Sequence, residues 1–134
     1  MCKKVLIGVI TALTLTMNAS AVEYSLKDNM LKLNSYMIQM QAAFIESNKD
    51  KAVRTANALN GEAKMLFGDE NLMAALLPKG KENKVRIALM SSRTIDDDVV
   101  IINASMNTGH WETAQNAYLD IQKTCMRCHT LIRD

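Results

Sequence analysis

Proline, glycine and aromatic side chains are scarce in this chain. Its 134 residues include one proline, five glycines, two phenylalanines, one tryptophan and three tyrosines. All-β folds need many turns, which draw on glycine and proline, and their strands favour alternating β-branched and aromatic side chains. The sequence shows neither pattern, so it favours a helical fold over a β-sandwich or barrel.

An excess of charge of one sign is also missing. The formal net charge is +2, and Lys3 and Lys4 are the only charged residues before position 22, so the rest of the chain carries equal numbers of basic and acidic side chains. We therefore predict no strongly basic face and no nucleic-acid partner. No long apolar segment follows residue 17, and so we expect no membrane span in the mature protein.

The first 21 residues have the pattern of a cleaved secretory signal. Two lysines precede an apolar run from Val5 to Met17, and Ala19-Ser20-Ala21 follows; these match the basic region, the hydrophobic region and the A-x-A cleavage site. The apolar run is shorter than the ~20 residues that span a bilayer. We expect residues 1–21 to be removed on export to the periplasm, which leaves one small domain at 22–134.

Apolar positions then recur at alternating steps of three and four, the spacing of a helical core seam. There are four such runs. A short polar link at 47–50 separates the first from the second, and another at 107–109 separates the third from the fourth. A longer stretch at 68–83, with one or two helical turns at 70–77, joins the second to the third. Short links join antiparallel neighbours, so the predicted fold class is all-α, an up-down-up-down antiparallel four-helix bundle. The seam positions are Leu26, Met30, Leu33, Met37, Met40 and Phe44; Ala52, Ala56, Leu59, Ala63 and Leu66; Val85, Ala88, Ser92, Ile95, Val99, Ile102 and Met106; and Ala114, Tyr118, Ile121, Cys125, Cys128 and Ile132.

The segment Cys125-Met126-Arg127-Cys128-His129 has the C-x-x-C-H spacing that attaches c-type haem. On a helix, Cys125, Cys128 and His129 project from one face. Two thiols can then reach the two vinyl groups of one porphyrin while the imidazole faces the iron. Because the cysteines continue the seam of the fourth run, we expect one covalently bound haem c inside the bundle, with His129 as the proximal iron ligand.

Other chemistries use the same residue types. The two cysteines could form a structural disulfide. A thioredoxin-type dithiol is expected beside a βαβ pattern, which the sequence lacks. Zinc normally takes four ligands, whereas 22–134 offers two cysteines and two histidines, with His110 far from the motif. The export signal favours haem, and a helical structural or interaction protein with an incidental C-x-x-C stays an alternative.

Geometry selects the ligand on the other side of the iron. In an antiparallel bundle the start of the first helix lies beside the end of the fourth, where His129 stands five residues from the chain end. Met30 is at the matching level, and Met37 lies seven residues further, or ~10 Å along the axis. We expect Met30 to be the distal ligand, with Met37 in reserve; an ordinary core role for Met30 stays open, because methionine is a common core filler.

Two resemblances support this interpretation. The ending C-M-R-C-H-T-L-I-R resembles the class II cytochromes c, the cytochrome c-prime group, in which C-x-x-C-H-x-x-aromatic-R lies near the carboxyl end of a four-helix bundle. Arg133 matches that arginine, while Ile132 replaces the aromatic residue. The segment from Leu26 to Asn34 is similar to the opening helix of cytochrome b562, where the methionine of a D-N-M-x-x-L-N run ligates iron, which implies the same role for Met30.

The resemblance implies a function in one of two branches. Class II members with a methionine ligand are low-spin electron carriers, whereas those with an apolar residue facing the iron are high-spin and bind small gases. Met30 favours a periplasmic carrier of single electrons that works with redox partner proteins; the alternative is a gas-binding protein with an open sixth position. Pairing of two bundles, as in many class II cytochromes, stays open, and the sequence shows no catalytic constellation, so we do not expect an enzyme.

For several other residues the sequence predicts contacts around the haem, core packing or exposure to solvent. Lys123, Arg127 and Arg133 are spaced along the haem-bearing helix and could flank the propionates or the haem edge, or steer an acidic partner. We interpret the acidic cluster at 96–98 as solvated surface. Met73 is expected to pack in the core or cover a haem edge, Tyr118 to fill core space, Trp111 to pack against a loop and His110 to be exposed.

Overall fold

The structure, a computed structural model, describes residues 26–133, and the side chains of residues 26–132. It is a helical bundle, which confirms the all-α class. The helices are α1 (Leu26–Ile45), α2 (Lys49–Phe67), α3 (Glu70–Leu76), α4 (Val85–Thr108) and α5 (Trp111–Arg133), with a 3-10 turn at Glu82–Lys84. The predicted signal at 1–21 lies outside the described residues.

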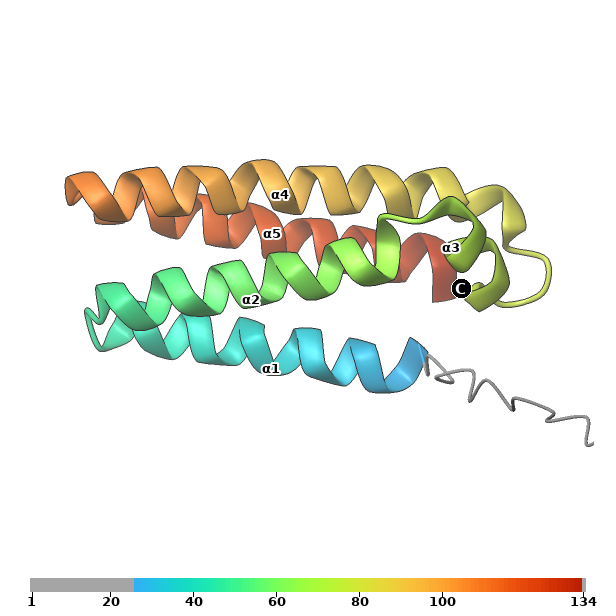
Figure 1. Cartoon of the computed structure of the whole chain (residues 1–134), viewed down its shortest axis with the longest axis horizontal. Helices are drawn as coiled ribbons and strands as arrows, with labels where there is room; N and C mark the ends of the chain where they lie inside the picture. The colour runs from blue at the N-terminus through green and yellow to red at the C-terminus, as the bar shows by residue number, and fades with distance from the viewer. Residues whose placement is uncertain (1–25, 134) are drawn as a thin grey trace, which may run out of the picture.

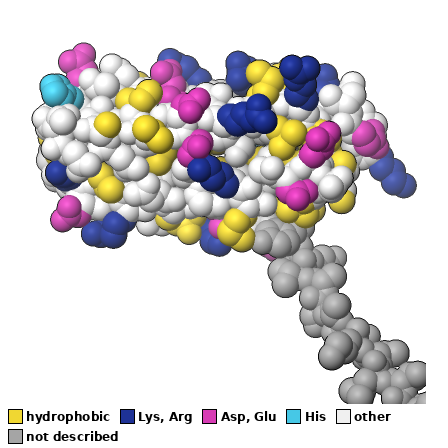
Figure 2. Space-filling view, turned by 45° about the horizontal axis from the view of Figure 1, so that its top comes forward, with side chains coloured by type: hydrophobic (Ala, Val, Ile, Leu, Met, Phe, Trp, Pro, Cys, Tyr) yellow, Lys and Arg dark blue, Asp and Glu magenta, His cyan; other side chains and the backbone are white. Residues whose placement is uncertain are grey.

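Figure 1 shows α1, α2, α4 and α5 side by side along the long axis of the molecule, with α3 and the loop before α4 at one end. The α1–α2 and α4–α5 turns lie together at the opposite end, which we call the turn end (residues 44–50 and 106–112). Among the described residues, no helix is long and apolar enough to cross a membrane. Figure 2 shows one face of the molecule, where basic and acidic side chains are interspersed among separate hydrophobic spots.

Local sequence signals set the helix ends. The Asn48 side chain accepts a hydrogen bond from the Lys51 N–H at 3.0 Å and so caps α2, and Asp69 caps α3 in the same way through the Leu72 N–H at 2.7 Å. Such caps satisfy amide groups that the first helical turn leaves unpaired. Gly109 ends α4 with φ +77°, a left-handed conformation that favours glycine.

The predicted seams form the core. Nearly all their members are buried, and Leu26, Met30, Met37 and Cys125 are partly buried against the same cluster. At the turn end, the ring of Phe44 contacts Trp111 edge-on, with centroids 6.4 Å apart, and Tyr118 at 5.6 Å. Tyr118 therefore fills core space as predicted. Trp111 packs against a core phenylalanine, and its packing against a loop stays a prediction.

The acidic cluster departs from the prediction of solvated surface. Asp97 is exposed, but Asp96 is half-buried. The Asp96 carboxylate accepts a hydrogen bond from the Asn60 amide of α2 at 2.6 Å and forms an ion pair with Lys64 at 2.6 Å. Asp98 is only 8% exposed. The reason is that α4 also buries polar residues beside its apolar seam. These are Ser91, Asp98 and Ser105, which are spaced by seven residues and so lie in one column along the helix.

Candidate functional site

A cavity of about 260 Å³ lies between α1, α5 and the neighbouring parts of α2 and α4. The structure brings the three residues of the C-x-x-C-H motif to its wall, and both candidate methionines line it from α1. Cys128 is buried, while Cys125, His129, Met30 and Met37 are each partly buried. The lining residues are Met30, Leu33, Asn34, Met37, Leu59, Phe67, Ser91, Ile95, Gln122, Thr124, Cys125, Met126, Cys128 and His129.

A second cavity, of about 600 Å³, adjoins the first at the end of the bundle that holds α3. The two cavities share five lining residues, which are Met30, Asn34, Phe67, Cys128 and His129. Its other walls come from the start of α1, from Met73 of α3, from Leu77 and Pro78, and from Ile132. Met73 is 1% exposed, so its predicted packing role is confirmed. We call this half of the molecule the cavity end.

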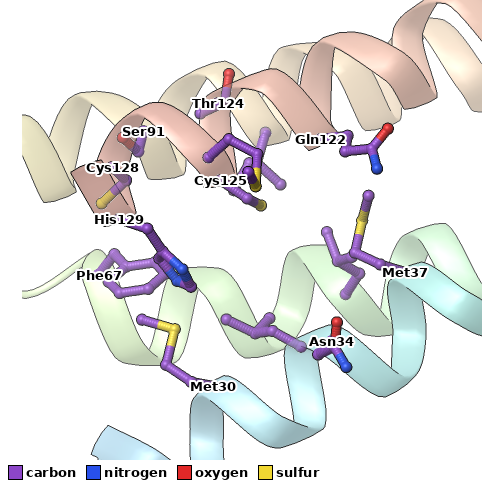
Figure 3. Close-up of a pocket in the computed structure, with 14 residues that line it drawn as sticks. Met30, Asn34, Met37, Phe67, Ser91, Gln122, Thr124, Cys125, Cys128 and His129 are labelled. Carbon is purple, nitrogen blue, oxygen red and sulfur yellow. The ribbon is translucent and has the colours of Figure 1, made fainter. Parts of the chain in front are cut away.

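The two methionines stand at different places around the first cavity. Figure 3 shows Met30 with its sulfur beneath the His129 ring, beside Phe67, whereas Met37 extends toward Gln122 at the other end of the cavity. Met30 lines both cavities and Met37 lines only the first. The difference follows from their spacing, because seven residues of helix separate them by ~10 Å along the axis.

Met37 has a structural role that the sequence did not indicate. The Tyr118 hydroxyl donates a hydrogen bond to the Met37 carbonyl oxygen at 3.5 Å, and Tyr118 in turn packs against Phe44. This contact ties the middle of α1 to α5 just beyond the cavity. The contact is long for a hydrogen bond between two oxygens, and it links the helix that carries Met30 to the helix that carries His129.

The two thiols are poorly disposed to ionise. Burial raises the pKa of Cys125 to about 11, and the neighbouring Cys128 adds to the effect. Burial also raises the pKa of Cys128, against a hydrogen bond with Ser91 and the positive charge of Arg127. Redox-active C-x-x-C motifs depend on a lowered thiol pKa, so this environment speaks against the dithiol alternative.

Polar side chains border the first cavity at positions that the sequence analysis did not single out. Asn34 and Gln122 are exposed at its rim, and Ser91 is 2% exposed in its wall. Asn34 follows Met30 by one helical turn, so the same α1 face brings both to the site. Phe67 was also missed; it is the last residue of α2 and lies one position beyond the predicted seam.

Lys123 and Arg127 of α5 line neither of these two cavities. Lys123 and Arg127 are exposed and line a separate cavity between α4 and α5. Arg133 ends α5, and its side chain lies outside the described residues. A contact of Arg133 with a haem propionate therefore stays a prediction.

Within the described part of the chain, no group of three or more His, Cys, Asp or Glu side chains is arranged to hold a metal ion. His110 is exposed at the turn end, where its Nδ1 lies 2.7 Å from the Thr108 hydroxyl. Comparisons of the chain with protein-family models, curated proteins and solved structures find no significant match.

Proposed function

We propose that this protein is a periplasmic c-type cytochrome that carries single electrons through one low-spin haem c. Cys125 and Cys128 would hold the haem as thioethers, with His129 and Met30 as its iron ligands. One observation carries the proposal: two thiols, an imidazole and a thioether from opposite helices converge on one cavity. The proposed architecture is an up-down-up-down antiparallel bundle around the haem, formed from residues 22–134 after loss of a signal at 1–21.

The residues present fit the group that the motif implies. The cysteines and the histidine are presented by consecutive turns of α5, as covalent attachment to one porphyrin requires, and all three line the first cavity. That cavity joins a second one through five shared residues, and together they reach the ~300–1,000 Å³ usual for cofactor sites. Most of the remaining lining residues are apolar, which suits a macrocycle with a hydrophobic face.

The axial assignment rests on the direction of the side chains. His129 comes from α5 and Met30 from α1, and they extend toward one another across the cavity (Figure 3). Met37 lies further along the cavity and extends toward Gln122, away from His129. It is therefore the weaker candidate. His/Met ligation raises the reduction potential of a haem, which suits a carrier that accepts an electron readily.

The rest of the site serves the same purpose. Phe67, Leu59 and Ile95 are buried around the motif and would limit the access of water to the iron. The packing of Phe44 on α1 against Trp111 and Tyr118 on α5, with the Tyr118–Met37 contact at 3.5 Å, would help to hold the two ligand-bearing helices together. Little rearrangement between oxidation states is what a one-electron carrier needs.

A gas-binding function is the second candidate, and one observation favours it. Met30 is only partly buried, is the fifth residue of α1 and lines both cavities. Carbon monoxide or nitric oxide could therefore displace the thioether without disturbing the core. In that case the sixth position would be open or easily vacated, and the protein would act as a c-prime-like gas binder.

The deciding experiment is the visible spectrum of the dithionite-reduced protein, expressed with haem-attachment machinery, before and after addition of carbon monoxide. Sharp low-spin bands that do not move support the electron carrier. A rapid shift to a carbon monoxide adduct supports gas binding. Colourless protein from a host with working attachment machinery would overturn both and support the structural or interaction protein.

A further inference from the structure

A third cavity, of about 400 Å³, lies between α4 and α5. Unlike the other two, it is lined entirely by polar and charged residues: Thr94, Asp98, Asp120, Lys123, Thr124 and Arg127. Asp98 is 8% exposed, whereas Asp120, Lys123 and Arg127 are exposed at the mouth. The cavity thus connects a buried carboxylate with solvent.

The Asp98 carboxylate is unusual because its burial is not compensated. Its Oδ2 atom is buried and has no hydrogen-bond partner among the described residues. The buried carboxylate of Glu62, 7% exposed, instead accepts a hydrogen bond from Lys32 at 2.6 Å. A buried carboxylate without a partner is costly when ionised and is relieved by taking up a proton.

The charges around Asp98 reinforce that tendency. The pKa of Asp98 is raised to about 6, first by burial and then by the negative charges of Asp120 and Asp97. The cationic residues of α5 that line this cavity are Lys123, which pairs with Asp120 at 2.8 Å, and Arg127, which is exposed. The Thr94 hydroxyl donates to the Met90 carbonyl oxygen. Asp98 therefore titrates about two pH units above an ordinary aspartate.

Asp98 is also next to the proposed haem site. Thr124 lines both the third cavity and the first, and Cys125 follows it directly. Thr124 is 6% exposed, and Figure 3 shows its hydroxyl pointing away from the first cavity. Thr124 therefore borders both cavities, and a change of charge on Asp98 would act on the haem site through Coulomb interaction across this residue.

We infer that Asp98 is a proton-binding site coupled to electron carriage, an inference that rests on the proposed function. When one electron arrives from a reduced partner, the Asp98 carboxylate binds one proton from solvent through the third cavity and becomes a neutral carboxylic acid. When the electron leaves, the O–H bond breaks and the proton returns to solvent. The added negative charge is thereby compensated inside the bundle, and the protein carries a proton together with each electron.

The test is a redox titration of the mature, haem-loaded protein between pH 5 and pH 8. This range extends from about one unit below to about two units above the Asp98 pKa of about 6. The midpoint potential should fall as pH rises through this range, because ionised Asp98 disfavours the added electron. A tenfold difference in proton affinity between the two redox states corresponds to about 59 mV. Asp98→Asn should make this dependence clearly weaker, leaving the part that the haem propionates contribute, whereas Asp97→Asn, the same change at an exposed neighbour on α4, should keep the full dependence.

Infrared difference spectroscopy between the oxidised and reduced states gives a direct readout. Reduction should produce a protonated-carboxyl band in the unmodified protein and in Asp97→Asn, and no such band in Asp98→Asn. If Asp98→Asn carries covalent haem and its potential has the same pH dependence as that of the unmodified protein, only the inference on Asp98 is overturned, and the proposed function is not affected. Failure of the protein to acquire haem would overturn the proposed function as well, so the two failures are distinguishable.

Discussion

The turn end and the cavity end of this bundle are built in different ways. At the turn end, Phe44, Trp111 and Tyr118 pack ring against ring and fill the space between α1 and α5. At the cavity end the same two helices approach each other without such large side chains, and they enclose the two adjoining cavities. Of the packed pairs of long helices, α1 and α5 make the least extensive contact.

This difference indicates where the bundle obtains its stability and where it has space for a ligand. The aromatic cluster and the two short turns fix the four long helices at one end (Figure 1). The other end can then leave space between Met30 and His129 without losing the alignment of the helices that carry them. The predictions that follow test this division, beginning with the largest expected effect.

Removal of both motif thiols should abolish the proposed function of the cavity end. In the double variant Cys125→Ala/Cys128→Ala we expect complete loss of covalently bound haem, because no other cysteine follows residue 2. Haem staining after denaturing electrophoresis, together with the mass of the mature chain, measures the loss. Leu119→Ala is the control on the same helix, since Leu119 is 44% exposed and lines none of the cavities described above. Covalent haem in the double variant would show that attachment does not use this motif.

The two methionines of α1 should respond differently to truncation. Met30→Ala is expected to convert the low-spin spectrum to a high-spin one and to allow rapid carbon monoxide binding, because it removes the thioether beneath His129 (Figure 3). Met37→Ala should keep the low-spin spectrum. The reverse result would assign the distal position to Met37.

Phenylalanine truncation compares the two ends directly. In protein expressed without haem-attachment machinery, Phe44→Ala should lower the free energy of unfolding by about 3–5 kcal/mol, because it opens a hole in a filled core. Phe67→Ala should cost about half as much or less, because Phe67 already borders two cavities and so loses fewer contacts. Denaturant unfolding measures both values. Equal losses would show that the cavity end is as tightly packed as the turn end.

The sequence predicted the long helices well because each has a regular apolar seam. The seams also placed Cys125 and Cys128 on the buried side of α5, and the helix ends near Gly68 and Gly109 followed from local signals. The level of Met30 relative to His129 needed only the assumption of neighbouring helices that run in opposite directions. Periodicity and spacing are local properties of the sequence, which is why they sufficed.

Several of the buried residues that were missed are polar and form a further column on the buried face. Thr55 and Glu62 on α2, and Ser91, Asp98 and Ser105 on α4, are buried at steps of seven residues beside the predicted seams. A seam counted from apolar residues alone omits these positions because their side chains are polar. The step of seven was a signal that could have found Asp98. Its lack of a partner depends on α5 and could not be predicted from α4.

The pH dependence of stability tests the buried carboxylate. The pKa of Asp98 is raised from 3.8 to about 6 in the folded protein, so folding favours the protonated form and stability falls as pH rises from about 4 to 6. Asp98→Asn should therefore raise the free energy of unfolding at pH 8 by about 2 kcal/mol, and should have little effect near pH 4. Denaturant unfolding at both pH values, with Asp97→Asn as control, measures this. An Asp98→Asn protein less stable at pH 8 would mean that the carboxylate has a stabilising partner.

Two glycines should give the smallest effects, and these should be of opposite sign. Gly109 ends α4 at the turn end with φ +77°, and Gly109→Ala should destabilise the protein by about 1 kcal/mol because an L residue is strained in this conformation. Gly61 lies inside α2, and a Cβ atom there would meet nothing within 4 Å, so Gly61→Ala should stabilise by about 0.5–1 kcal/mol. Thermal unfolding of the two variants measures both shifts. If Gly109→Ala leaves the stability unchanged, the α4–α5 turn tolerates rearrangement, and the turn end owes its stability to the Phe44 cluster alone.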